Sequence, residues 1–202
     1  MKLSKSDINT LDKATKLNLI NSLTGAKPAN LIGTADKAGQ ENLAIISSVV
    51  HLGTTPPLLG FFLRPNPEKN RHTYQNIIES PFFTINAISV SQIKNAHATS
   101  FNYPKSESEF EACNIESEYI SNFEAPFVKK SPIKIGLKHI ETKVIESNNS
   151  VLIVGEIMLV ETADTTIDLE DLEIAAISGL NSYYSLHKVD EQPYMIERMS
   201  RK

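Results

Sequence analysis

Two strand-like segments on either side of a short turn constrain the fold of this chain more than any other feature. Ile133–Glu146 and Val151–Thr162 look like two long strands, and Ser147-Asn148-Asn149-Ser150 between them is typical of a hairpin turn. Strand-like segments also occur earlier in the chain, at 29–35, 43–52, 58–64 and 82–88. Neighbouring strands do not alternate regularly with helices. The sequence therefore favours an antiparallel barrel of six strands with helical additions over a doubly wound fold.

The segments between and after these strands predict helices. They span residues 6–24, 70–79, 90–99, 106–113, 168–177 and 182–188. Gly25 and Pro28 end the first helix. Ser106, three residues before Glu109, predicts a capping box at the start of the fourth. The tail from Glu191 is polar and is expected to be extended.

Composition limits the class of protein. Of 202 residues, 41% are hydrophobic and 22% are charged, which is ordinary for a soluble globular protein. No apolar run approaches the roughly 20 residues that a membrane helix needs, and the N-terminus lacks the apolar stretch of a signal peptide. The single cysteine, Cys113, permits no intrachain disulfide. We therefore expect a reducing, cytoplasmic location.

Charge and motif content argue against several functions. The net charge of −4 disfavours general nucleic-acid binding, which usually needs a basic face. The five histidines are scattered without metal-ligand spacing, so no metal is expected. The phosphate-binding loop GxxxxGK[ST] and the GxGxxG, HExxH and GxSxG motifs are all absent.

Ser47 and Ser48 interrupt an otherwise apolar strand, AIISSVVHL. Small polar residues in a barrel strand bring the backbone close to a ligand. The N–H groups and hydroxyls there can pair with a planar, hydrogen-bonding ring. The alternative interpretation is a sheet edge that faces water, since many strands have one solvated face.

A second group of residues concentrates positive charge after an apolar strand. Arg64, Lys69 and Arg71 outweigh Glu68 by two charges, and Thr73 lies near an expected helix start. A phosphate monoester is recognised by a bidentate guanidinium, a hydroxyl and helix N-terminal amides. A solvated loop is the alternative.

Two further groups of polar residues leave both interpretations open. Asn86, in the strand FFTINAI, must have its amide satisfied either by a neighbouring turn or by a cofactor. His97, Thr99, Ser100 and Tyr103 cluster in the loop NAHATSFNYP. A capped helix end with a surface histidine explains the same loop.

Taken in order, these segments resemble the flavin reductase-like family of FMN-binding split barrels, and most closely its flavoredoxin-like branch. The similarity covers residues from about 28 to 160. It rests on the segments NLAIISSVVHL, PPLLGFFLRP, RHTYQNI, FFTINAIS, NAHATSFNYP, SESEF and APFVKKSPIK.

The resemblance implies a fold and an assembly. A six-stranded antiparallel Greek-key split barrel with inserted helices would occupy residues 28–162 of a single domain. A helical extension would precede it at 1–27, and helices with a tail would follow at 163–202. Two chains would form a homodimer, with FMN in a groove at the subunit interface.

The resemblance also implies roles for individual residues. The implied cofactor-binding residues are Ser47, Ser48, Val49, Arg64, His72, Thr73, Asn86, Ser100 and Tyr103. The serine segment would line the isoalloxazine, while Arg64, His72 and Thr73 would hold the phosphate. His97 is the catalytic candidate, as a residue that tunes access or protonation.

One segment departs from the family's pattern. AISGLNSYY at 176–184 keeps Gly179 and the tyrosines but lacks the arginine and second glycine that the family commonly has there. The resemblance therefore gives no expectation for nicotinamide handling or flavin contacts by this region.

Three functions follow from the resemblance. The first is an NAD(P)H-dependent flavin reductase, in which a hydride passes from the nicotinamide to flavin N5. The second is a flavoredoxin-like electron carrier whose FMN is reduced by a partner protein. The third is a dimeric barrel that lacks the cofactor and has a binding role, because a fold alone does not fix a function.

Overall fold

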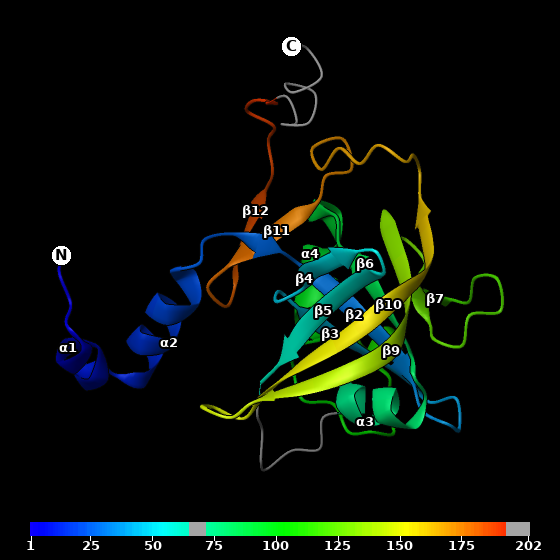
Figure 1. Ribbon diagram of the computed structural model, residues 1–202, viewed down its shortest axis with the longest axis horizontal. Coiled ribbons are helices and arrows are strands. Elements are labelled where there is room, and N and C mark those ends of the chain that lie inside the picture. The colour runs from blue at the N-terminus through cyan, green and yellow to red at the C-terminus, as the bar shows by residue number, and fades with distance from the viewer. Residues whose placement is uncertain (65–71, 193–202) are drawn as a thin grey trace.

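The computed structural model describes residues 1–64 and 72–192, and its centre is a twisted sheet of seven strands (Figure 1). In spatial order these strands are β3 (Glu41–Ile46), β2 (Asn30–Ala35), β6 (Phe82–Ala87), β9 (Ile133–Ile145), β10 (Ser150–Thr162), β5 (Pro57–Leu63) and β4 (Val50–Thr54). Every neighbouring pair is antiparallel. The mainly β, antiparallel class expected from the sequence is confirmed.

The β9–β10 hairpin is the longest pairing in the sheet and lies where the sequence predicts it. The register runs from Ser150 opposite Ile145 at the turn to Thr162 opposite Ile133 at the far end. Two register shifts interrupt the ladder, and such bulges bend and twist a strand. At Gly155, beside one shift, an added Cβ would lie 2.6 Å from the Phe83 ring, so only glycine fits there.

The predicted strand 43–52 is wrong as a single element, because the chain breaks into β3 and β4 at residues 47–49. These two strands form opposite edges of the sheet. Three linking residues span at most about 14 Å, so the sheet must curl until its edges approach each other. The sheet has seven strands instead of the six expected because of this break.

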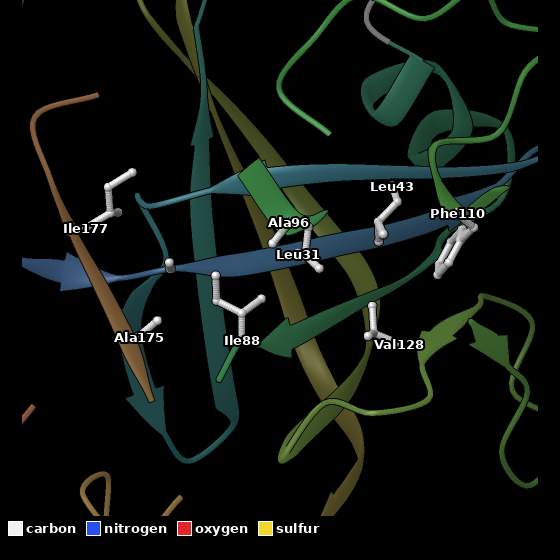
Figure 2. Packing of buried hydrophobic residues seen from close by; sticks show 9 residues of the cluster. Leu31, Leu43, Ile88, Ala96, Phe110, Val128, Ala175 and Ile177 are labelled. Atoms are coloured by element: carbon white, nitrogen blue, oxygen red, sulfur yellow. The ribbon is translucent and has the colours of Figure 1, made fainter. Parts of the chain in front are cut away.

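Two apolar clusters lie on opposite faces of β2, which alternates between them. Ile32 points into a cluster contributed by five strands and α3. The sheet must therefore curl around this cluster; its members are Ile32, Phe61, Leu63, Ile77, Phe83, Ile85, Leu137 and Ile153. Leu31 points into the other cluster, which segments outside the barrel cover (Figure 2). Its members are Ala29, Leu31, Leu43, Ile88, Ala96, Phe110, Val128, Ala175 and Ile177.

The N-terminal region forms two helices, α1 (Lys5–Thr10) and α2 (Lys13–Ser22), in place of the single predicted helix. The break occurs at Asp12, whose carboxylate accepts hydrogen bonds from the N–H groups of Ala14 and Thr15 and so begins a new helix. Neither helix contains a buried residue. Both project from the sheet in Figure 1.

The other helices are short and lie close to their predicted places. They are α3 (His72–Glu79), the 3₁₀ turn η1 (Val90–Gln92), α4 (Ile93–Ala98) and α5 (Glu109–Ala112). The first two residues predicted for the helix at 70–79 lie outside the described residues. The predicted capping box is wrong. Ser108 caps α5 in place of Ser106, and the Glu109 carboxylate bonds instead to the N–H of Leu43.

The predicted C-terminal helices at 168–177 and 182–188 are wrong. The chain forms the strands β11 (Ala175–Ser178) and β12 (Ser182–Ser185), which join β1 (Lys27–Pro28) in a small sheet of order β1-β11-β12. Pairing overrides helix propensity here because it buries β11, where Ala175 is fully buried. A two-stranded pair of β7 (Ser117–Glu118) and β8 (Phe127–Val128) completes the described elements. Most of the predicted extended tail, from 193 onward, lies outside them.

We expect the enclosed cluster to dominate stability, and one matched pair of substitutions tests this. Ile153, on β10, is fully buried, whereas Ile78, on α3, is 54% exposed. Ile153→Ala should lower the free energy of unfolding by about 2–5 kcal/mol, because it leaves a cavity. Ile78→Ala should lower it by about 1 kcal/mol or less. Urea denaturation measures both, and equal losses would contradict a core at this position.

Candidate functional site

A cleft of about 810 Å³ opens where four parts of the fold meet. These are the end of β3 with Ser47 and Ser48, the end of β5, the start of α3, and the loop 99–104 that follows α4. The turn between β11 and β12 forms a further wall. This volume lies within the range of about 300–1,000 Å³ that is usual for small-molecule and cofactor sites.

The outward edge of β3 supplies backbone donors along one side of the cleft. The N–H of Leu43 donates to Glu109 Oε2 (2.9 Å), and the N–H of Ile45 donates to the Thr99 hydroxyl (3.0 Å). Ser47 is the next residue in this alternation and lines the cleft. Its N–H has no acceptor among the residues at 1–64 and 72–192. This N–H is therefore available to a ligand.

Ser48 lines the cleft too, but its hydroxyl is already used by the fold. Ser48 Oγ accepts from the N–H of Phe62 (3.1 Å) and donates to the carbonyl of the same residue (3.0 Å). The Ser48 hydroxyl thus satisfies both backbone groups of Phe62, as the backbone of a neighbouring strand would do. Val49, the third residue of this segment in the sequence-based prediction, does not line the cleft and packs against the enclosed apolar cluster.

Basic side chains gather at the part of the cleft near β5 and α3. Arg64, at the end of β5, donates from Nη2 to Asn21 Oδ1 of α2 (2.5 Å). Lys27 also lines the cleft, and its Nζ donates to the Asn21 carbonyl (3.3 Å) and the Thr24 hydroxyl (3.0 Å). The structure places Arg64, His72 and Thr73, the residues predicted to hold a phosphate, on the wall of this one cleft. Sequence reasoning missed Lys27, which has no charged neighbours to mark it.

Glu109 is a buried acid on the wall of this otherwise cationic cleft, and sequence reasoning missed it as well. Glu109 is only 7% exposed. Burial raises the pKa of the Glu109 carboxyl above its ordinary value, while the hydrogen bond from Leu43 N–H and the charge of His72 act in the opposite direction. The carboxyl group holds β3 to α5 at an energetic cost that depends on its protonation.

Ser100 and Tyr103, both predicted to bind the cofactor, line the cleft from the loop after α4. The Tyr103 hydroxyl donates to the Ala98 carbonyl (3.3 Å), and the Cys113 thiol donates to the Tyr103 oxygen (3.5 Å). The hydrogen bond with Cys113 and burial raise the pKa of Tyr103 to about 12. Tyr103 is therefore a neutral hydrogen-bonding group at physiological pH.

Besides Val49, two further residues predicted for the site lie outside the cleft. Asn86 is fully buried, donates to the Leu31 carbonyl (3.1 Å) and the Thr84 hydroxyl (2.8 Å), and accepts from Val128 N–H (3.0 Å). This arrangement matches the alternative in which the Asn86 amide is satisfied by the protein itself.

His97 forms a hydrogen bond between its Nδ1 and the Tyr183 hydroxyl (2.9 Å). Of the rings beside it, that of Phe101 lines the cleft.

The described part of the chain contains no cluster of three or more His, Cys, Asp or Glu side chains suited to a metal ion. None of its helices has both the length and the apolar character needed to cross a membrane.

Comparison with known proteins places this fold and cleft in a family. A model of the flavin reductase like domain matches residues 25–172. The chain therefore belongs to the flavin reductase-like family. No curated protein matches this chain.

Solved structures show the same relationship. A protein from Shewanella frigidimarina NCIMB 400, described as a candidate flavin reductase with a split barrel domain, is 45% identical, with a TM-score of 0.92 and coverage of 96% of this chain and 99% of its own. The nitrilotriacetate monooxygenase component B of Bacillus cereus is 18% identical, with a TM-score of 0.81 and coverage of 95% and 98%. The flavoredoxin of Desulfovibrio vulgaris (Miyazaki F) is 21% identical, with a TM-score of 0.74 and coverage of 96% and 98%. The last two show the fold alone, which is the split barrel.

The buried Glu109 carboxyl predicts a pH-dependent contribution to stability. Because its pKa is raised in the folded state, the native protein binds more protons than the unfolded chain just above the ordinary glutamate pKa. The contribution of Glu109 is therefore most favourable at low pH and declines as pH rises through the folded-state pKa. Glu109→Gln keeps a carbonyl oxygen for Leu43 N–H but cannot ionise.

We expect the free energy of unfolding of Glu109→Gln to fall less than that of the wild type as pH rises from 4 to 7. Urea denaturation across this range measures the difference, and Glu111→Gln, on the exposed side of the same helix, is the control. Parallel pH profiles for wild type and Glu109→Gln would show that the fold does not raise the pKa of Glu109.

Proposed function

We propose that this protein binds FMN in the cleft and acts as an NAD(P)H-dependent flavin reductase. The observation that carries the proposal is the combination, in one cleft, of an open backbone donor at Ser47 with a cationic group at Arg64 and Lys27. Family membership supports a flavin-related oxidoreductase, and the cleft residues suit the two chemically different ends of FMN. When bound, FMN would supply the redox chemistry, by accepting a hydride at N5 from the nicotinamide.

The protein's part in this reaction is binding and electrostatics. The Ser47 N–H would donate to the ring and stabilise negative charge that develops on it. Phe101 and Leu180 would provide apolar walls. Arg64, His72 and Thr73 would hold the phosphate, with Ser100 and Tyr103 bordering the cleft. No side chain need act as a nucleophile.

His97 enters this proposal through its neighbours and not through direct contact. Its ring packs edge-on against Phe101, with centroids 6.3 Å apart, and against Tyr183 of β12, 5.7 Å apart. We propose that His97 sets the position of the Phe101 ring at the cleft. It is therefore a positioning residue, in place of the catalytic role that the sequence suggests.

A flavoredoxin-like electron carrier is the second candidate. Strand β11 contributes Ile177 to the cleft and the β11–β12 turn contributes Gly179 and Leu180, and none of these residues carries charge. This turn therefore offers no cation for the phosphates of a nicotinamide dinucleotide. If the FMN-loaded protein stays oxidised when mixed with NADH and with NADPH, the carrier is favoured over the reductase.

We further propose a homodimer in the cytoplasm. Exposed large apolar side chains occur on β4, β9 and β10, at Val50, Leu52, Ile140, Val144, Met158 and Val160. Such a group of exposed apolar residues marks an interaction surface, and two-fold dimers are the commonest oligomers. The single cysteine suits a reducing compartment.

The dimer predicts a molar mass twice that of one chain in light scattering after size-exclusion chromatography. Val144→Lys places a charge on the proposed interface and should shift the protein toward the monomer. The control is Lys143→Val, at the neighbouring position on β9, which replaces lysine by valine. This variant should not shift the protein toward the monomer. A wild-type monomer at micromolar concentration would contradict the proposal.

Arg64 provides the test of FMN binding. Removal of a charge-assisted hydrogen bond costs about 1.5–3 kcal/mol, or roughly tenfold to 150-fold in affinity. Arg64→Ala should therefore weaken FMN binding by this factor while riboflavin binding changes little. Flavin fluorescence titration measures both affinities. Lys143→Ala, which removes a charge on the exposed part of β9, is the control.

The same titration tests the third function, a dimeric barrel that has a binding role and lacks the cofactor. A wild-type protein that binds no flavin at micromolar concentration would support this function. Arg64→Ala would then change nothing. NADH and NADPH oxidation in the presence of FMN tests the reductase activity directly.

A further inference from the structure

Four buried polar side chains connect α3 to the edge of the main sheet beside the cleft. Asn42, on β3, donates from Nδ2 to the Thr34 hydroxyl of β2 (3.4 Å) and to the Thr73 hydroxyl of α3 (3.1 Å). Asn76, on α3, donates to the same Thr34 hydroxyl (3.1 Å). All four residues are at most 7% exposed. The network therefore spans three elements within the protein interior.

Two members of this network, Asn42 and Thr73, also line the cleft. In the structure, both hydrogen bonds of the Asn42 amide nitrogen are made with hydroxyl oxygens, one on β2 and one on α3. The Asn42 side chain is therefore held between two elements before any ligand arrives.

This orientation determines which hydrogen-bonding role the Thr73 hydroxyl has left. A hydroxyl has one hydrogen to donate and two lone pairs to accept with. Asn42 occupies an acceptor position of Thr73 Oγ1, so the hydroxyl hydrogen points away from Asn42. Among the residues at 1–64 and 72–192, this hydrogen has no acceptor. A phosphate dianion has many acceptor oxygens and suits such a donor.

We propose that Asn42 is a positioning residue for phosphate recognition, which orients the Thr73 hydroxyl as a donor toward the phosphate of FMN. Asn42 thereby increases the preference of the cleft for FMN over riboflavin, which lacks the phosphate. The inference rests on the proposed function, because it takes FMN as the ligand. Preorganisation of this kind raises affinity by removing the cost of ordering the donor on binding.

The network supplies a matched control. Asn76 is the same residue type, is equally buried, and donates to Thr34, but it makes no bond to Thr73. Asn42→Ala and Asn76→Ala therefore both remove a buried amide from the same network. Only Asn42→Ala removes the partner of the Thr73 hydroxyl.

The test is a fluorescence titration of the flavin-free protein with FMN and with riboflavin. Thr73→Val should weaken FMN binding roughly tenfold or more, because it removes a hydrogen bond to a charged group. Asn42→Ala should weaken FMN binding by about fivefold and leave riboflavin binding within about twofold. Asn76→Ala should leave the ratio of the two affinities unchanged. The double variant Asn42→Ala with Thr73→Val should bind FMN no more weakly than Thr73→Val alone, since Asn42 acts through Thr73.

Each other outcome overturns the proposal in a recognisable way. Multiplied losses in the double variant would show that Asn42 acts independently of Thr73. An equal loss for FMN and riboflavin, or the same change of ratio in Asn76→Ala, would show a purely structural role. Thermal unfolding checks each variant, and Asn42→Ser replaces Asn42→Ala if the latter does not fold. A wild-type protein without flavin affinity would overturn the proposed function together with this inference, whereas a wild type that prefers FMN and an unchanged ratio in Asn42→Ala would overturn the inference alone.

Discussion

The two hydrogen bonds between the Ser48 hydroxyl and the backbone of Phe62 are the interaction on which the rest of the structure depends. They satisfy both polar groups of a β5 residue at the point where the chain passes from one sheet edge to the other. The pairing of β4 with β5 then begins at Val50 opposite Gly60. The curled sheet is therefore completed by a side chain, and the backbone around Ser47 is left out of the ladder.

The open edge of β3 leaves one backbone donor at the cleft because two of its other donors are covered. An exposed edge strand presents unpaired N–H groups and invites pairing with other chains. Here Glu109 and Thr99, from outside the barrel, accept hydrogen bonds from two of these groups, and the donor at Ser47 is left for the cleft. The two residues that protect the edge thus also leave the open donor at one place.

Glu109 performs this protective role at a cost. A carboxylate is a stronger acceptor than a neutral group, but burial opposes its charge, and it also lies near the residues proposed to hold an anion. Lys27 and Arg64 outweigh it at the cleft. The anchoring of α5 and the proposed recognition of phosphate would therefore make opposing demands on the same region.

Local patterns in the sequence predicted the elements whose stability is local. The β9–β10 hairpin follows from alternating strands and a four-residue turn, and Arg64 and Thr73 follow from the charge around them. The C-terminal strands were mispredicted because Ala175 and its neighbours have no strand pattern of their own and depend on pairing with β1. Such pairing is decided by residues nearly 150 positions earlier in the chain.

The missed site residues share the same physical cause. Asn42 and Glu109 lie in segments with ordinary strand and helix polarity, and they reach the cleft only because the fold brings β3 against α3 and α5. The position of His97 outside the cleft has a similar cause. Its hydrogen bond joins Tyr183, 86 residues further along the chain, and a local pattern does not reveal that contact.

The contact between Arg64 and Asn21 shows how the cationic part of the cleft can be both held in place and available. α2 buries no residue, so this contact and those of Lys27 connect the helix to the rim of the cleft. The Asn21 oxygen is a neutral acceptor on the protein surface, and hydrogen bonds to charged acceptors are stronger than those to neutral ones. If a phosphate binds as proposed, its replacement of Asn21 as the partner of Arg64 would therefore gain more than the helix loses. The guanidinium can be ordered before binding without being committed to the protein.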